Sequence, residues 1–243
     1  MTTVTHYVIG AFWGPRKESP ATCARRIQEL LRGLSCWHPS ASWGATGLRG
    51  ENPLAMDTQA LAQALGGMES ITGRDDSLGT LITCWPGDPE TALGPGVHIQ
   101  FGGTAPEAVN SCRILSPEPF APTLNRPATP ATLVAMLRAM TLAWDPDWGW
   151  AARDAPLTPL EAASTTDTHV GWLTYITRRW GEVPAGLAAE RVETLAGRGS
   201  IIVLPEVLLV HETAESVTQA LEVQRRLLEH GVLRRLTPEL MES

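Results

Sequence analysis

Residues 4–34 read VTHYVIGAFWGPRKESPATCARRIQELLRGL, and this stretch decides the fold. Residues 4–13 are rich in β-branched and aromatic side chains, which predicts a strand. Ser19 followed by Pro20 is typical of a helix N-terminus, with a capping hydroxyl and a proline in the first helical position. Apolar side chains then recur every three or four residues, which predicts an amphipathic helix over residues 20–34. This stretch is therefore expected to form a strand, a turn and a helix.

The rest of the chain continues as short strands and helices without strict alternation. Residues 35–56 show no period and are expected to form a loop, whereas residues 116–130 hold five prolines and predict an extended connector. This order of elements predicts an α+β fold, with a mixed, largely antiparallel β-sheet and about four helices packed against it. We expect a single domain over residues 1–243, in which any internal boundary would fall in the connector. Further strands are expected over residues 78–85, 96–101, 109–115, 170–176, 191–195 and 199–204, and further helices over residues 58–65, from Thr129-Pro130 onward and over about 213–230.

Charge and hydropathy argue against two classes of function. The 243 residues carry 19 basic and 26 acidic side chains, a net charge of −7, whereas direct nucleic-acid binding needs a positive surface. No window reaches about 18 uninterrupted apolar residues, so we expect no membrane span. The first residues lack the basic region and the cleavage site of a secretory signal. Together with only four cysteines, this predicts a cytoplasmic protein in a reducing compartment.

The charged residues are also unevenly chosen and unevenly placed. Acids concentrate in residues 51–76, 139–170 and 199–224, and two of these stretches would make a negative face if they converged. The alternative is ordinary solvated acid. Eighteen of the 19 basic residues are arginine, which we attribute to the base composition of the genome.

No motif of a known catalytic type is present. The sequence has no phosphate-binding glycine loop, no dinucleotide fingerprint, no zinc-protease helix motif and no nucleophile elbow. Its six histidines are scattered singly and its four cysteines form no CxxC pair, so we expect buried free thiols, no metal site and no cofactor. The close aspartate pairs, Asp75-Asp76 and Asp145-x-Asp147, are interpreted as turns. We therefore predict no catalytic residues and no enzyme activity.

Tryptophan and acid gather in one segment. Between Trp144 and Asp154 lie three tryptophans and three aspartates, residue types suited to an interface with a basic protein partner. Asp145-Pro146-Asp147 is expected to form a turn with its acids outward. The alternative is that this segment only packs the preceding helix onto the sheet. The candidate partner-binding residues are Asp145, Asp147, Trp148, Trp150, Asp154, Asp75 and Asp76.

One block of sequence is more specific than these patterns. Residues 13–19, WGPRKES, followed by CARR at residues 23–26, resemble the start of the immunity protein 52 family. WDPDW at residues 144–148 and GWLTY at residues 171–175 resemble two later blocks, and the expected strand over residues 199–204 with the closing helix fits the C-terminal pattern of that family.

The resemblance carries its own expectations. Members of the family are cytoplasmic antidotes encoded beside polymorphic toxins. Their usual partner is a restriction-endonuclease-like nuclease, often delivered by a type VI secretion system. This implies binding without catalysis and supplies no contact residues, and Trp13 and Trp172 of the shared blocks are expected in the core.

Our functional hypothesis is therefore an immunity protein that binds and neutralises a cognate nuclease toxin and protects the producing cell. The candidate partner-binding residues named above become candidate toxin-binding residues. Two alternatives stay open from the sequence. One is a small hydrolase whose site is assembled from scattered aspartates and histidines, and the other is an adaptor of the secretion apparatus. The sequence leaves the oligomeric state open.

Overall fold

The computed structural model describes four α-helices, nine β-strands and two short 3₁₀ helices. The described residues are 7–34, 42–48, 51–68, 76–87, 96–115, 129–153, 168–205 and 213–236. In chain order the elements are β1 (Tyr7–Trp13), α1 (Pro20–Gly33), β2 (Trp43–Ala45), α2 (Thr58–Gly66), η2 (Asp76–Leu78), β3 (Thr80–Pro86), β4 (Val97–Phe101), β5 (Asn110–Leu115), α3 (Pro130–Trp144), β6 (Trp148–Arg153), β7 (Leu173–Thr177), η3 (Arg178–Trp180), β8 (Arg191–Leu195), β9 (Gly199–Val203) and α6 (Ala214–Glu229).

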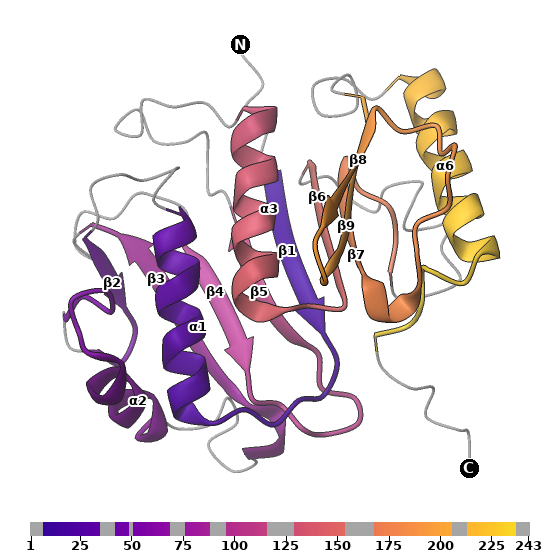
Figure 1. Cartoon of the computed structure of the whole chain (residues 1–243). Helices are drawn as coiled ribbons and strands as arrows, with labels where there is room; N and C mark the ends of the chain where they lie inside the picture. Colours follow the sequence, from indigo (N-terminus) through magenta and orange to yellow (C-terminus); the bar gives the residue numbers. More distant parts are fainter. Residues whose placement is uncertain are drawn as a thin grey trace.

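The described strands form one sheet in the order β2-β3-β4-β5-β1-β6-β7-β9-β8, and each neighbouring pair is antiparallel. β1 lies in the middle of the sheet, between β5 and β6 (Figure 1). Phe12 of β1 therefore has two Cα partners that are distant in sequence, Ser111 and Trp148. This arrangement confirms the predicted α+β class with a largely antiparallel sheet.

Helix starts follow the capping chemistry of the sequence. The Ser19 hydroxyl accepts the Thr22 amide at 3.2 Å, and Pro20 is the first residue of α1. The Asp57 carboxylate accepts the Ala60 amide at 2.8 Å at the start of α2. Each cap satisfies an N–H that has no partner within its helix. The predicted helix starts at these two positions are confirmed.

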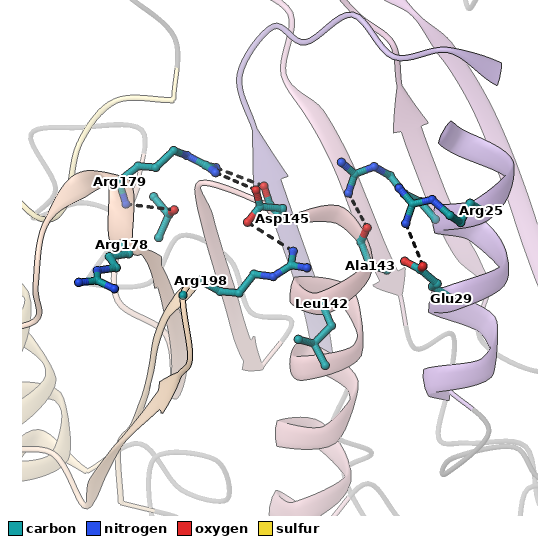
Figure 2. Close-up of a pocket in the computed structure, with 11 residues that line it drawn as sticks. Arg25, Glu29, Leu142, Ala143, Asp145, Arg178, Arg179 and Arg198 are labelled. Atoms are coloured by element: carbon teal, nitrogen blue, oxygen red, sulfur yellow. Dashed lines mark hydrogen bonds and ion pairs between the residues drawn. The ribbon is translucent and has the colours of Figure 1, made fainter. Parts of the chain in front are cut away.

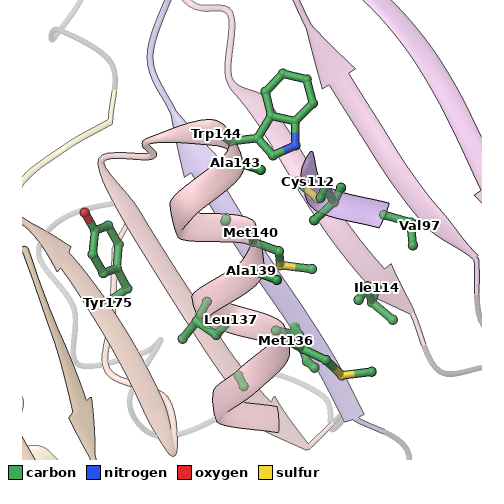
Figure 3. Packing of buried hydrophobic residues seen from close by; sticks show 14 of the residues in the cluster. Val97, Cys112, Ile114, Met136, Leu137, Ala139, Met140, Ala143, Trp144 and Tyr175 are labelled. Carbon is green, nitrogen blue, oxygen red and sulfur yellow. The ribbon is translucent and has the colours of Figure 1, made fainter. Parts of the chain in front are cut away.

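α1 and α3 form a helical layer on one face of the sheet. α1 contacts α2 and α3, and α3 contacts β1, β6 and β7. Leu137 and Met140 of α3 are fully buried in this layer, and Figure 3 shows Leu137 on the side of the helix toward Tyr175 of β7. The Leu137 Cδ1 atom lies only 3.0 Å from where a Cβ on Gly149 would sit. A glycine at this position of β6 therefore lets the helix lie close to the sheet.

Tryptophans occupy the centre of this core. The rings of Trp13, on β1, and Trp144, the last residue of α3, stack with centroids 5.1 Å apart, and both side chains are buried. Trp172, just before β7, is also buried and donates its indole N–H to the Pro205 carbonyl at 3.1 Å. The predictions that Trp13 and Trp172 are core residues are confirmed. Stacking of this kind adds about 0.5–1.5 kcal/mol to the free energy gained from burial.

Two strands were not expected from the sequence. β2 lies inside the segment predicted as a loop, and pairs with β3 through Trp43 and Pro86. β6 begins directly after the predicted Asp145 to Asp147 turn and is a central strand, paired on both sides. Its sequence, WGWAAR, lacks the branched residues that indicate a strand, so its position is set by pairing with β1 and β7. Most of the predicted connector, residues 116–128, lies outside the described residues.

α6 lies beside β8 and β9, at the end of the sheet opposite to α2 (Figure 1). The buried Gln224 accepts the Val170 amide on its side-chain oxygen at 2.9 Å, and Gln219 donates to the Ala188 carbonyl at 2.6 Å. These two side chains fix α6 to the segments that precede β7 and β8. The predicted helix over about 213–230 and the predicted hairpin of β8 and β9 are both confirmed.

Candidate functional site

The two aspartates that follow α3 are held by one arginine. Asp145 ends α3 in the left-handed region, with φ 48°, and its amide still reaches the Thr141 carbonyl. Arg179 donates one guanidinium nitrogen to Asp145 Oδ2 and the other to Asp147 Oδ1, each at 2.8 Å. Burial lowers the pKa of Arg179, but the hydrogen bonds that it donates to the two carboxylates outweigh this effect and raise that pKa above its ordinary value. The predicted turn thus has both acids in ion pairs.

The turn between β8 and β9 lies beside this pair. Arg198 Nη1 is 3.6 Å from Asp145 Oδ1, on the other side of the carboxylate from Arg179 (Figure 2). The backbone carbonyl of Arg198 accepts two hydrogen bonds, from the Arg178 amide at 2.7 Å and from the Tyr175 hydroxyl at 3.1 Å. The backbone that carries Arg198 is therefore fixed to the end of β7.

A buried ion cluster donates hydrogen bonds to the C-terminus of α3. The Glu18 carboxylate is only 3% exposed and lies 2.8 Å from Arg26 Nε and 3.4 Å from Arg16 Nη2. Arg16 donates to the Trp144 carbonyl at 2.8 Å, and Arg26 donates to the Ala143 carbonyl at 2.6 Å. These carbonyls are at the negative end of the helix dipole and have no partner within the helix. Arg16 and Glu18 of the WGPRKES block are therefore structural residues.

An open pocket of about 350 Å³ shares Arg26 and Ala143 with this cluster, and we call it the arginine pocket (Figure 2). Five arginines and two carboxylates line it, contributed by α1, the end of α3, η3 and the β8–β9 turn. Several of these guanidinium groups are accessible, because the side chains of Arg25, Arg179 and Arg198 are 56%, 51% and 37% exposed. The lining residues are Arg25, Arg26, Glu29, Leu142, Ala143, Asp145, Thr177, Arg178, Arg179, Gly197 and Arg198.

The two tryptophans of the predicted interface that follow the turn, Trp148 and Trp150, lie on the sheet face opposite to α3. Trp148 is 3% exposed, stacks on Phe12 at a centroid distance of 5.2 Å and donates its indole N–H to the His169 carbonyl at 3.1 Å. Trp150 is half-buried, with its ring centroid 6.2 Å from that of Trp148. Trp148 is therefore a packing residue of the sheet, and Trp150 offers only part of its ring to a partner.

Of the three remaining candidates, the structure describes only Asp76. Asp75 and Asp154 lie outside the described residues. Asp76 begins η2, which precedes β3, at the same end of the sheet as Asp145 but separated from it by β4, β5 and β1. That these residues bind a toxin stays a prediction. The convergence of the acidic stretches into one face also stays untested, because Glu69, Glu161, Asp167, Glu206 and Glu212 lie outside the described residues as well.

The arginines of the pocket were missed in the sequence. Arg178-Arg179 follow the predicted strand directly, and Arg198 lies in the predicted hairpin turn. Because β7 and β9 are antiparallel neighbours, the end of one meets the start of the other, which brings these residues together. The sequence signal for the pocket is a basic doublet at a strand end and an arginine in a turn, and it is hard to recognise in a chain whose basic residues are almost all arginine.

Other chemistry is limited within the described residues. They contain no group of three or more His, Cys, Asp or Glu that could hold a metal ion. Cys23, Cys84 and Cys112 are buried free thiols, as predicted, and burial raises the pKa of Cys23 and Cys84 to about 12. None of the described helices is long and apolar enough to span a membrane.

Comparison with known proteins gives a match to one family model and matches to solved structures. The family model described as Immunity protein 52 matches residues 5–236. Among solved structures, the Pseudomonas aeruginosa T6SS protein PA0821 is similar, with a TM-score of 0.54 and 12% sequence identity, over 94% of this chain and 76% of that chain. At this identity the likeness shows a shared fold alone. A search of curated proteins finds no match.

Proposed function

Because the chain belongs to the immunity protein 52 family, we propose that it binds and neutralises a cognate toxin and so protects the cell that produces both. The family match over residues 5–236 carries this proposal, since it covers nearly the whole chain. The structural neighbour is described as a T6SS protein, which supports a toxin delivered by a type VI secretion system. The place of action is the cytoplasm, where an incoming toxin meets its target.

The toxin of this proposal is a nuclease of the restriction-endonuclease-like class. A nuclease domain needs a positive surface to hold phosphates, and this chain has a net charge of −7. Opposite net charges accelerate association at low ionic strength, which suits an antidote that must act before its target is cut.

Neutralisation in this proposal occurs by binding and not by catalysis. Burial raises the pKa of Cys84 to about 12, so this thiol stays protonated at pH 7 and is a poor nucleophile. The carboxylates of Asp145 and Asp147 each accept a hydrogen bond from Arg179, so one oxygen of each is already occupied. The open pocket that they border is lined by guanidinium groups, which bind anions and do not act as bases at neutral pH.

The test uses the protein encoded by the gene adjacent to that of this chain. Its toxin domain is co-expressed with the full chain, and the two should co-elute from size exclusion in 0.3 M salt. The purified domain is then titrated with the chain while cleavage of plasmid DNA is measured. If neutralisation occurs by binding, cleavage of the plasmid should stop once the chain reaches a fixed molar ratio to the toxin domain.

Three results would overturn the proposal in different ways. Neutralisation at far less than one chain per toxin would indicate an enzyme. Separate elution, with cells still protected, would indicate repair or degradation. Stable binding that leaves DNA cleavage and cell killing unchanged would indicate an adaptor of the secretion apparatus.

A further inference from the structure

The arginine pocket has more positive charge than its own carboxylates balance. Five of its lining residues are arginines, against Glu29 and Asp145. Arg178 is exposed and has no ion pair within the described residues, and Figure 2 shows its side chain pointing away from Asp145. Arg25 is also accessible, although it is paired with Glu29 at 2.9 Å. In a chain of net charge −7, this is a local positive surface.

An exposed apolar side chain borders the same pocket. Leu142 of α3 is 48% exposed, and it is one of three large hydrophobic side chains that are exposed in the described part of the chain. A second pocket, of about 360 Å³, shares Arg178 and Gly197 with the first and is lined by Val192, which is 42% exposed. Arginine is enriched at protein interface hot spots, and an exposed apolar side chain beside it contributes favourable free energy when a partner removes it from water.

The walls of the pocket are fixed before any partner binds. Arg26 is held between the Glu18 carboxylate and the Ala143 carbonyl, and Arg179 is held by two carboxylates. The Arg198 backbone is fixed by two hydrogen bonds to its carbonyl. A preorganised surface loses little side-chain entropy on binding, which raises affinity for a given set of contacts.

We propose that the arginine pocket is the surface through which this chain docks an acidic segment of its toxin, in which carboxylate side chains flank an apolar one. This rests on the proposed function. The carboxylates pair with Arg178, Arg198 and Arg25, and the apolar side chain contacts Leu142. Arg179 is paired with Asp145 and Asp147, which compete with the segment for its guanidinium. Because the whole chain has a net charge of −7, the same segment is disfavoured outside the pocket, and the pocket therefore also sets the orientation of the complex.

The main experiment measures the dissociation constant of the toxin domain for the full chain and for charge-reversed variants. Arg178→Glu should weaken binding at least tenfold at 0.1 M salt, because it removes a guanidinium that has no ion pair within the described residues and places a carboxylate against carboxylates. The matched control is Arg225→Glu, an exposed arginine of α6 outside both pockets, which changes the net charge equally and should stay within twofold. Leu142→Ser should weaken binding about fivefold, whereas its control, Leu81→Ser at a side chain 43% exposed on β3, should not.

A second experiment probes the pocket without the toxin. The peptide Ac-Glu-Glu-Leu-Glu-Glu-NH₂ is titrated into the full chain, and backbone amide chemical shifts are followed by NMR. The peptide should shift the amides of Leu142, Arg178, Gly197 and Arg198 with a millimolar dissociation constant. The same peptide with Lys in place of Glu should not shift them, and Arg178→Glu should abolish the effect.

The outcomes separate this proposal from the proposed function. A toxin that binds the wild-type chain and Arg178→Glu equally well overturns the pocket alone. A toxin that does not bind the wild-type chain overturns the proposed function, while the peptide still tests the pocket. Equal shifts with inorganic phosphate would reduce the pocket to a general anion site. Tighter binding of a single-stranded oligonucleotide than of the peptide would assign it to nucleic acid, and either result contradicts the proposal.

Discussion

Glu18→Gln tests whether the WGPRKES block stabilises the folded protein through a buried ion cluster. The Glu18 side chain is 3% exposed and is the carboxylate partner of both Arg16 and Arg26, whose side chains are 27% and 17% exposed. A neutral glutamine of nearly the same shape removes the nearest counter-charge of two partly buried guanidinium groups. Breaking a buried pair in this way costs about 3–5 kcal/mol.

The expected loss is at the low end of that range, at about 3 kcal/mol. Both arginines retain a carbonyl acceptor at the end of α3, and both reach some solvent. For a domain of this size such a loss lowers the melting temperature by about 6–12 °C. Urea unfolding followed by tryptophan fluorescence measures the loss of free energy. The stacked rings of Trp13 and Trp144 report on the cluster, because the guanidinium groups of Arg16 and Arg26 lie over them.

The matched control is Glu29→Gln on the same helix. Glu29 pairs with Arg25 at 2.9 Å, four residues apart, but the two side chains are 40% and 56% exposed. Such an exposed pair contributes about 0.5 kcal/mol or less. If Glu18→Gln cost no more than its control, the helix carbonyls alone would hold the two arginines, and the reasoning from the buried carboxylate would be wrong.

Three further predictions concern other parts of the molecule. Gly79→Ala should lower the free energy of unfolding by more than about 2 kcal/mol, because φ is +83° and a Cβ would lie 2.4 Å from the Phe101 carbonyl oxygen. Gly102→Ala, at φ +78° with open space, should cost less in the same urea titration, and equal costs would rule out the clash. The folded Cys84 thiol keeps its proton up to a pKa of about 12, whereas an unfolded thiol ionises near 9.0. The unfolded chain then binds fewer protons, so stability should fall as the pH rises above about 9, and Cys84→Ala should reduce this fall. Asp145→Asn with Asp147→Asn should leave toxin binding equal or tighter, because Arg179 is freed for the acidic segment. Slower association of this variant, most of all at low salt, would mean that the two carboxylates contact a basic partner directly.

Local sequence was sufficient for most of the elements. Caps and apolar periods predicted α1, α2 and α6 within one or two residues, because each signal lies within the segment that it describes. β6 was missed for the opposite reason. Its six residues have weak strand propensity, and they become a central strand only because β1 and β7 present unpaired backbone groups on both sides.

The candidate site shows the same division. The sequence correctly marked Asp145 and Asp147 as a turn at the end of a helix, yet charge counting could not place Arg179 against both of them. Glu18, Arg26 and the α3 carbonyls also meet only through helix packing.

The sequence by itself therefore determined the fold class, the helix boundaries and the family, because these depend on local periods and on contiguous motifs. Only the tertiary structure decided which charges are neutralised and which remain free. Paired and unpaired arginines are identical in the sequence, and the difference lies in distances across the sheet end that joins residues 16–26, 143–147, 178–179 and 198. Electrostatic energy depends on those distances and on burial, so a net charge of −7 is compatible with a pocket lined by five arginines and two carboxylates.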